Sequence, residues 1–554
     1  MRTVNKAVLI TFVFALCVNI ELFPQITERP RPAEWEQLVP GARFLDRFLP
    51  LPQGTLSKDV WGAENVIPRY IDNGIEDPMY SYWGGNILRG NDGQYHLFVC
   101  RWREDSPNGH HEWPRSHVVH AVSAQAHGPF TVRDSIGSGH NPEIFRMKDG
   151  RYVLYVIDNR YVGESLNGPW TRGEFEFDCR GRRLIEGLSN LTFARREDGS
   201  FLMVCRGGGV WISETGLSPY RQLTDRRVYP DVDGQFEDPV VWRDHIQYHL
   251  IVNDWLGRIA FYLRSKDGVS WIVDPGEAYL PGIARHPDGS SEDWFKYERM
   301  KVLQDEYGRA IQANFAVIDV LKNDDKPNDI HSSKNIAIPL NPGLLLTVLD
   351  TRPITPATKT IRVKIAAEKG FDPHTDIDLA SLRFGASTEV NFGRGAKMKS
   401  TEKSGADLII TFDAAGNGIA PDEFAPKLIG KNIRGELLYG YARLPYINYI
   451  EPILSALVPV FTPRTDAMEI SVEVQNFGQV ASSEATLQLT VEKNGEKISA
   501  GSAVVPPLKP YEKTTVFFSA APFFEKGVEY NCTITIRSKE KAFSPFGFKA
   551  TPIR

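Results

Sequence analysis

Carboxylates recur beside basic and aromatic residues in the first 340 or so residues of this 554-residue sequence, a combination suited to acid and base chemistry. The clearest signal is the pair Glu237-Asp238, which stands at a predicted strand start before Pro239, a residue that cannot donate to a strand ladder. Glu143 and Glu298 occupy related positions. These four residues are our catalytic candidates. The alternative is that they accept hydrogen bonds from backbone N–H groups at the strand starts.

Six further residues accompany these carboxylates and could bind a ligand. A tryptophan can stack on a sugar ring or pack within the fold, and a histidine can donate a proton, bind a cation or be structural. An arginine beside a glutamate can simply pair with it. The predicted binding residues are Trp83, His140, Asn141, Asn190, Arg299 and His331.

A fivefold internal repeat indicates how these residues are positioned. Each copy reads as a strand, a tight turn, usually with glycine, and a second strand rich in aromatic residues; Asp-Gly turns supply the positive φ angles that short hairpins need. A second hairpin follows most copies, so that four strands recur about every 50 residues, the pattern of a β-propeller blade. The copies begin at Trp83, His140, Ser189, Glu237 and Glu298.

These repeats predict an all-β chain with three folded parts. Residues 26–342 are expected to form a five-bladed β-propeller, which is the catalytic domain. The repeat ends after Pro342, and residues 343–454 predict a small β-sandwich. Residues 455–554 alternate apolar and polar side chains over several strands, which predicts an immunoglobulin-like β-sandwich. Both smaller modules are expected to position or tether the propeller.

The N-terminus and the overall charge constrain location and partners. Residues 1–25 read as a secretory signal peptide, because Arg2 and Lys6 precede an apolar run, Ala7 to Val18, that is too short to cross a bilayer. We therefore expect a secreted or periplasmic protein with no membrane span in the mature chain. The formal net charge of -5 provides no basic field for phosphates, which argues against nucleic acid as a partner.

Equivalent repeat positions should converge on one pocket, since the innermost strand of every propeller blade starts at the same face. The ring position in the five copies is held by Gly84, Asn141, Asn190, Asp238 and Arg299. Asp238 is the only carboxylate among them, which makes it the leading catalytic candidate. We expect this funnel to bind a carbohydrate, either an oligosaccharide or a polysaccharide.

Several short motifs resemble those of the five-bladed glycoside hydrolases related to arabinanases, β-xylosidases and α-1,3-(3,6-anhydro-L-galactosidases). The resemblance implies exo-acting hydrolysis of plant or algal saccharides, with a general base on the first blade, a carboxylate that orients or tunes it, and a general acid on a later blade. The resemblance implies that the reaction needs no cofactor. Whether a structural calcium ion lies on the propeller axis is left open. The matching motifs are 73–77, 81–85, 139–143, 237–239 and 297–299.

The first repeat departs from that family pattern. It begins Trp83-Gly84-Gly85, with no carboxylate where the related enzymes have their base. The four candidate carboxylates could supply a rearranged pair, Asp77 could reach into the funnel, or the site could bind sugar without cleaving it.

Two other functions remain open from the sequence. A polysaccharide lyase would use His140 to abstract a proton beside a uronic carboxylate, with Arg299 and Arg101 neutralising that carboxylate. A non-catalytic carbohydrate-binding protein would show affinity without turnover, which the missing first-repeat acid favours.

Overall fold

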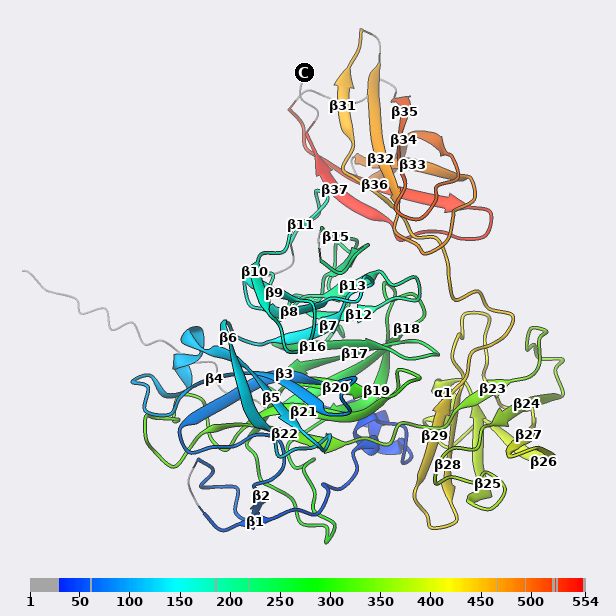
Figure 1. Cartoon of the computed structure of the whole chain (residues 1–554). Coiled ribbons are helices and arrows are strands. Elements are labelled where there is room, and N and C mark those ends of the chain that lie inside the picture. The colour runs from blue at the N-terminus through cyan, green and yellow to red at the C-terminus, as the bar shows by residue number, and fades with distance from the viewer. Residues whose placement is uncertain are drawn as a thin grey trace, which may run out of the picture.

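The structure is a computed structural model that describes residues 29–551 except 60–61, 185–186, 218, 466, 494, 521–523 and 525–526. Nearly all of its regular elements are β-strands (Figure 1), which confirms the all-β class. The predicted signal peptide, residues 1–25, lies outside the described residues. Within the described part, no helix has the length and apolar character needed to cross a membrane.

Five sheets follow one another between Tyr80 and Pro339, and within each sheet the main strands pair in chain order. The first three contain β3 (Tyr80–Arg89), β4 (Tyr95–Arg103), β5 (His117–Ser123) and β6 (Thr131–Ser138); β7 (Glu143–Arg146), β8 (Tyr152–Val156), β9 (Asn159–Gly163) and β10 (Trp170–Gly173); and β12 (Thr192–Arg195), β13 (Phe201–Val204), β14 (Val210–Ser213) and β15 (Tyr220–Gln222), with β11 (Phe177–Asp178) beside β15. The last two contain β16 (Phe236–Arg243), β17 (Tyr248–Asp254), β18 (Ile259–Ser265) and β19 (Ile272–Tyr279); and β20 (Lys296–Gln304), β21 (Ala310–Ile318) and β22 (Ser333–Pro339).

The first strands of these sheets lie side by side in a closed, propeller-like ring. β3 contacts β7, β12 contacts β16, and β20 contacts both β16 and β3. Between β7 and β12, the Glu143 carboxylate accepts a hydrogen bond from the backbone N–H of Phe193 at 2.9 Å. The glycines predicted at the first turns have positive φ angles of 79°, 97°, 85° and 78° at Gly93, Gly150, Gly199 and Gly308, as tight hairpins require.

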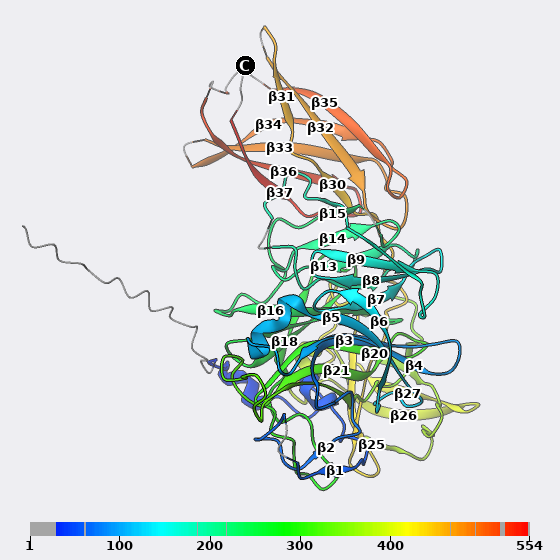
Figure 2. The ribbon, with the colours of Figure 1, turned by 60° about the vertical axis from the view of Figure 1, so that its left-hand side comes forward.

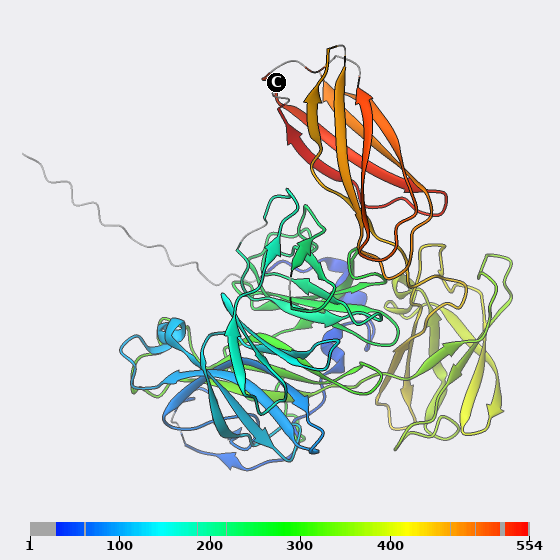
Figure 3. The same cartoon turned by 45° about the horizontal axis from the view of Figure 1, so that its top comes forward.

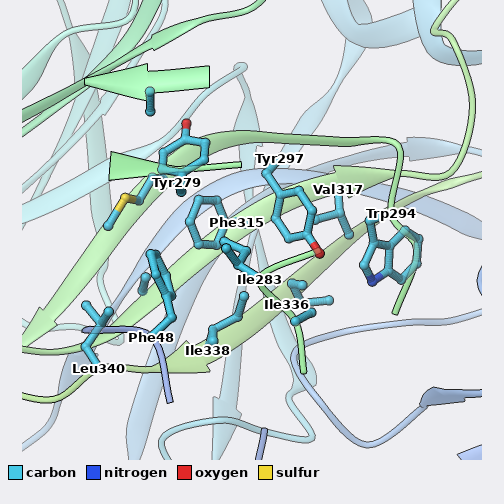
Figure 4. Close-up of a cluster of buried hydrophobic side chains, with 14 of the residues drawn as sticks. Phe48, Tyr279, Ile283, Trp294, Tyr297, Phe315, Val317, Ile336, Ile338 and Leu340 are labelled. Atoms are coloured by element: carbon cyan, nitrogen blue, oxygen red, sulfur yellow. The ribbon is translucent and has the colours of Figure 1, made fainter. Parts of the chain in front are cut away.

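The N-terminal segment packs against the last two sheets. It comprises η1 (Ala33–Gln37), η2 (Phe44–Arg47), β1 (Leu56–Ser57) and β2 (Arg69–Tyr70), and the backbone N–H of Leu49 bonds the Pro339 carbonyl at 2.9 Å. Phe48 packs in a hydrophobic core with Phe315 and Leu340 (Figure 4). A third short helix, η3 (Gly109–Arg115), lies between β4 and β5.

Beyond the ring, one seven-stranded sheet has its own core, and Val390 of the short helix α1 (Ser387–Val390) belongs to a second cluster with Ile246 and Tyr441. β25 pairs with both β26 and β28, so the seven strands form one continuous sheet, and the sandwich expected for residues 343–454 remains a prediction. The strands are β23 (Leu346–Val348), β24 (Thr360–Ile365), β25 (Ile377–Gly385), β26 (Ala396–Ser404), β27 (Asp407–Asp413), β28 (Lys427–Asn432) and β29 (Leu437–Tyr441).

The last module has two four-stranded sheets that pack over one core. Figures 2 and 3 show it as a separate orange and red body above the ring. Its immunoglobulin-like character remains a prediction. The strands are β30 (Leu454–Ala456), β31 (Val460–Pro463), β32 (Met468–Asn476) and β35 (Lys513–Ala520) in one sheet, and β33 (Ala485–Lys493), β34 (Glu496–Val505), β36 (Tyr530–Ser538) and β37 (Phe546–Ala550) in the other.

Candidate functional site

The five ring positions share one unusual backbone conformation. Gly84, Asn141, Asn190, Asp238 and Arg299 have φ angles of 64°, 54°, 49°, 53° and 54°. Asparagine and aspartate tolerate this left-handed region better than other residues with a side chain, whereas a bulky residue such as arginine rarely adopts it. The repeat aligned from the sequence is therefore also a repeat of backbone geometry.

A β-bulge accompanies this conformation in the three sheets whose first strand begins before the ring position. The register with the second strand shifts between Trp83 and Asn86 in β3, between Glu237 and Val240 in β16, and after Glu298 in β20. A bulge re-aims side chains and often occurs beside functional sites. Here it directs the ring side chains toward one another.

The ring side chains form a continuous hydrogen-bonded chain. The amide of Asn141 donates to Asn190 at 2.9 Å, and the amide of Asn190 donates to Asp238 Oδ1 at 3.0 Å. Arg299 Nη1 donates to the same oxygen at 2.7 Å, and its backbone N–H donates to Asp238 Oδ2 at 3.2 Å. Asp238 is thus buried with both oxygens occupied, which suits a residue that holds the ring together better than one that contacts a ligand.

Glu237, the neighbour of Asp238, is the more open carboxylate. Its side chain is 21% exposed, with Oε1 3.5 Å from Arg206 Nη1 and 3.2 Å from the Asn190 amide nitrogen. Burial raises the pKa of Glu237 and repulsion from Asp238 raises it further, to about 7, against the attraction of Lys322. Glu237 can therefore carry a proton at neutral pH.

Glu298 lies in the opposite electrostatic environment. Lys322 Nζ donates to its Oε2 at 2.6 Å and Lys296 Nζ to its Oε1 at 3.3 Å. Burial favours the neutral acid, but the two ammonium groups outweigh burial and lower the pKa of Glu298 to about 2. Glu298 therefore remains ionised, and its side chain is only 3% exposed.

Lys322 also connects this carboxylate to Trp83. Its Nζ lies 4.8 Å from the Trp83 ring centroid, and the indole also makes an edge contact with His110 of η3 at 4.8 Å. Trp83 is buried, so it packs within the fold and presents no open face to a sugar ring. Sequence reasoning missed both lysines, although Lys296 stands only two residues before Glu298.

His140 lies beside the ring and is hydrogen-bonded within the protein. Its Nδ1 lies 3.0 Å from Ser116 Oγ and 3.4 Å from Cys100 Sγ. Burial lowers the pKa of His140 well below the usual histidine value, and the positive charge of Arg299 lowers it further. The imidazole is therefore neutral.

Glu143 lies beyond the ring position, farther along the first strand of its sheet. It accepts a hydrogen bond from Lys301 of β20 as well as from the backbone of β12. Both Glu143 and Lys301 line a cavity of about 930 Å³ formed by the later parts of the first strands. The structure thus separates Glu143 from the group around Glu237.

Two other candidates also lie outside this group. His331 Nδ1 is 2.9 Å from Asp319 Oδ2, and its Nε2 is 3.9 Å from Glu64. Asp77 accepts a hydrogen bond from the Tyr82 hydroxyl. The contacts of His331 and Asp77 therefore lie at the start of the first sheet and in the loop after β21.

The ring also bears on the calcium ion left open for the propeller axis. The Arg299 guanidinium already places a positive charge among the ring side chains, paired with Asp238. Repulsion from this charge would oppose a cation beside it. The position of Arg299 therefore disfavours calcium on the axis, and a calcium ion there remains a prediction.

No family model matches this sequence, and no curated protein matches it. Similar solved structures include Zg3597, a family 117 glycoside hydrolase of the marine bacterium Zobellia galactanivorans, at 14% identity and a TM-score of 0.34, covering 49% of this chain and 88% of that one. The catalytic domain of a GH62 α-L-arabinofuranosidase of Coprinopsis cinerea has 12% identity and a TM-score of 0.33, covering 49% and 94%. The GH43 protein BlXynB of Bacillus licheniformis has 9% identity and a TM-score of 0.31, covering 84% and 89%.

Proposed function

We propose that the chain is a glycoside hydrolase in which Glu237 is the general acid. The observation that carries this proposal is the opposite pKa shifts of two carboxyl groups at the ring, Glu237 raised to about 7 and Glu298 lowered to about 2. Environments that move two carboxyl pKa values apart assign one group as the acid and the other as the ionised partner. Glycosidases require such a pair.

In this mechanism Glu237 gives its proton to the glycosidic oxygen as the bond to the anomeric carbon breaks. Glu298 stays ionised, and because Lys322 and Lys296 occupy both its oxygens it acts as a positioning residue that holds Lys322 near Glu237. A water molecule then adds to the anomeric carbon, and its proton restores Glu237. Asp238 acts as a positioning residue, since it fixes Arg299 and Asn190 and its charge helps to keep the Glu237 proton in place.

The wider assignment follows from the architecture and the motif resemblance together. We propose that the five sheets are the five blades of a propeller and that the substrate is a plant or algal oligosaccharide or polysaccharide attacked from its end. The two C-terminal modules would position the propeller on that substrate. Export from the cytoplasm would bring the enzyme to polymeric glycans.

The Glu237→Gln variant tests the proposed acid, after a panel of plant and algal glycans has identified a substrate. Glutamine keeps the shape but cannot donate the proton, so we expect kcat to fall about 10²–10⁴-fold. Glu214→Gln, at an exposed position after β14, is the matched control and should keep wild-type activity. Activity of Glu237→Gln within about threefold of wild type would contradict the proposal.

A polysaccharide lyase is the second candidate, because of the cations beside Glu237. The side chains of Arg206 and Lys322 are 39% and 28% exposed and could neutralise a uronic carboxylate, while the neutral His140 could accept a proton. A lyase product contains a new carbon–carbon double bond and absorbs ultraviolet light, whereas a hydrolysis product does not. Sugar binding without any product would instead support the non-catalytic alternative.

A further inference from the structure

Three carboxylates gather away from the ring, where the first sheet meets the loop that follows β21. They belong to Glu104, directly after β4, and to Asp325 and Asp329 in the loop. One oxygen from each side chain lies within 4.8 Å of the other two. Three like charges at this spacing repel one another unless a cation lies between them.

Asp325 is the member whose environment calls for a ligand. It is only 3% exposed, and among the residues that the structure describes no hydrogen bond or ion pair reaches its carboxylate; Oδ2 is fully buried. A buried, unpaired carboxylate is strongly unfavourable, so native proteins pair such groups or use them as metal ligands.

The other two carboxylates are held in place by the protein. Glu104 Oε2 accepts a hydrogen bond from Ser81 Oγ at 2.9 Å. Asp329 accepts hydrogen bonds from the backbone N–H groups of Lys326 and His331, each at 2.8 Å. These bonds orient the two carboxylates and leave lone pairs that can coordinate a cation.

The neighbouring lysines are directed to other partners. Lys334 Nζ lies 3.4 Å from Glu76, and Lys326 Nζ bonds the Asn323 carbonyl. His331, two residues after Asp329, is paired with Asp319. The two lysines still attract Glu104 and Asp325 through space and offset part of their negative charge, but their close contacts are with other groups.

We propose that Glu104, Asp325 and Asp329 bind a calcium ion. The donors are all oxygens, which suits a hard divalent cation. Calcium is favoured over magnesium because it accepts irregular sets of carboxylate, carbonyl and water oxygens, whereas magnesium demands near-octahedral geometry. The site is distinct from the ring, where Arg299 lies.

The ion would fix a loop that serves the ring site. The loop carries Lys322, whose Nζ donates to Glu298. The backbone N–H of Asn328 bonds the Glu104 carbonyl at 3.2 Å, His111 Nε2 lies 2.6 Å from Asn323 Oδ1, and Gly109 packs directly against the Asp325 backbone. Calcium would add a link between the loop and the first sheet.

Calcium titration of the chelator-treated full chain tests the binding itself. Isothermal titration calorimetry should show one Ca²⁺ per chain, with Mg²⁺ at least about tenfold weaker, and saturating Ca²⁺ should raise Tm as expected for a ligand of the folded state. Absence of binding would overturn the proposal, and tighter binding of Mg²⁺ would overturn the choice of metal. Neither readout depends on enzymatic activity, so the outcome is independent of the proposed hydrolysis.

A matched pair of variants locates the site. Asp325→Asn should abolish the Ca²⁺-induced rise in Tm and, without Ca²⁺, should melt at or above the wild-type temperature because one repelling charge is gone. Asp324→Asn makes the same charge change at the adjacent, exposed residue and should keep the Ca²⁺ response. A normal Ca²⁺ response in Asp325→Asn, or an equal loss in Asp324→Asn, would contradict the assignment.

Discussion

At the residue scale, Glu237 and Asp238 show how adjacent carboxylates acquire different roles. Asp238 adopts a left-handed φ and is enclosed by Asn190 and Arg299. Glu237 precedes it, remains partly exposed and experiences the negative charge of Asp238. The motif marks the site from the sequence, but only the backbone geometry distinguishes the proposed proton donor from the residue that positions it.

Asp238→Asn tests the positioning role. It leaves the buried Arg299 guanidinium without its counter-charge, so we expect a loss of about 3–5 kcal/mol in unfolding free energy. It also removes repulsion from Glu237, so the pKa that governs activity should shift downward. Urea unfolding and the pH profile of any remaining activity measure both effects, and wild-type values for both would contradict the role.

Glu237 also makes a prediction about stability. Its folded-state pKa of about 7 exceeds the unfolded value of about 4.3, so the folded state binds the proton more tightly. The contribution is fully present below the unfolded pKa and is lost as pH rises toward 7. Glu237→Gln should therefore match wild type near about pH 4 and exceed it by about 1–3 kcal/mol near about pH 8. Chemical unfolding at both pH values measures the difference, and equal effects at both would contradict the raised pKa.

At the element scale, the repeat made much of the ring predictable. Aligned turns predict the five residues that share a left-handed φ, because a repeated strand-turn-strand unit places equivalent residues at equivalent positions. The repeat does not predict residues in the loops. Lys322, for example, lies in the loop after β21, which has no counterpart in the other copies of the repeat. The repeat does not predict the burial of Trp83 either, because His110 of η3, which lies outside the repeat, packs against the indole.

Two neighbouring glycines in β3 test the bulge geometry. Gly84 has a φ of 64°, and an added Cβ would lie an ordinary 3.5 Å from its nearest neighbour, so Gly84→Ala should cost only about 1–2 kcal/mol of backbone strain. At Gly85 the φ is 91° and the Cβ would lie 2.1 Å from the Phe98 carbonyl oxygen. Gly85→Ala should therefore be much more destabilising in thermal or urea unfolding, and equal losses would contradict the geometry.

At the scale of the whole molecule, buried arginines join the C-terminal modules to the ring. Arg47 of η2 lies 4.5 Å from the Tyr439 ring centroid and 4.9 Å from that of Tyr262. Arg182, after β11, donates to the Ser455 hydroxyl at 2.9 Å and to the Ala456 carbonyl at 3.1 Å. These contacts join residues that are far apart in the sequence. The sequence pattern therefore predicts the modules but not the contacts that attach them to the ring.

Arg47 provides a test of this attachment. Its planar guanidinium packs among aromatic rings in a way that lysine cannot reproduce, so Arg47→Lys and Arg47→Ala should both loosen the β23–β29 module. We expect faster proteolytic cleavage near residue 343 and separate thermal transitions for the two parts. A single transition at the wild-type Tm in both variants would show that the contact is dispensable.

The pH dependence of kcat/KM on an identified glycan, compared between wild type and Glu237→Gln, tests the central claim most directly. If Glu237 is the general acid, wild-type activity falls as pH rises through about 7, and this descending limb disappears from the residual activity of the variant. The same limb in both proteins, with similar rates, would contradict the assignment of Glu237.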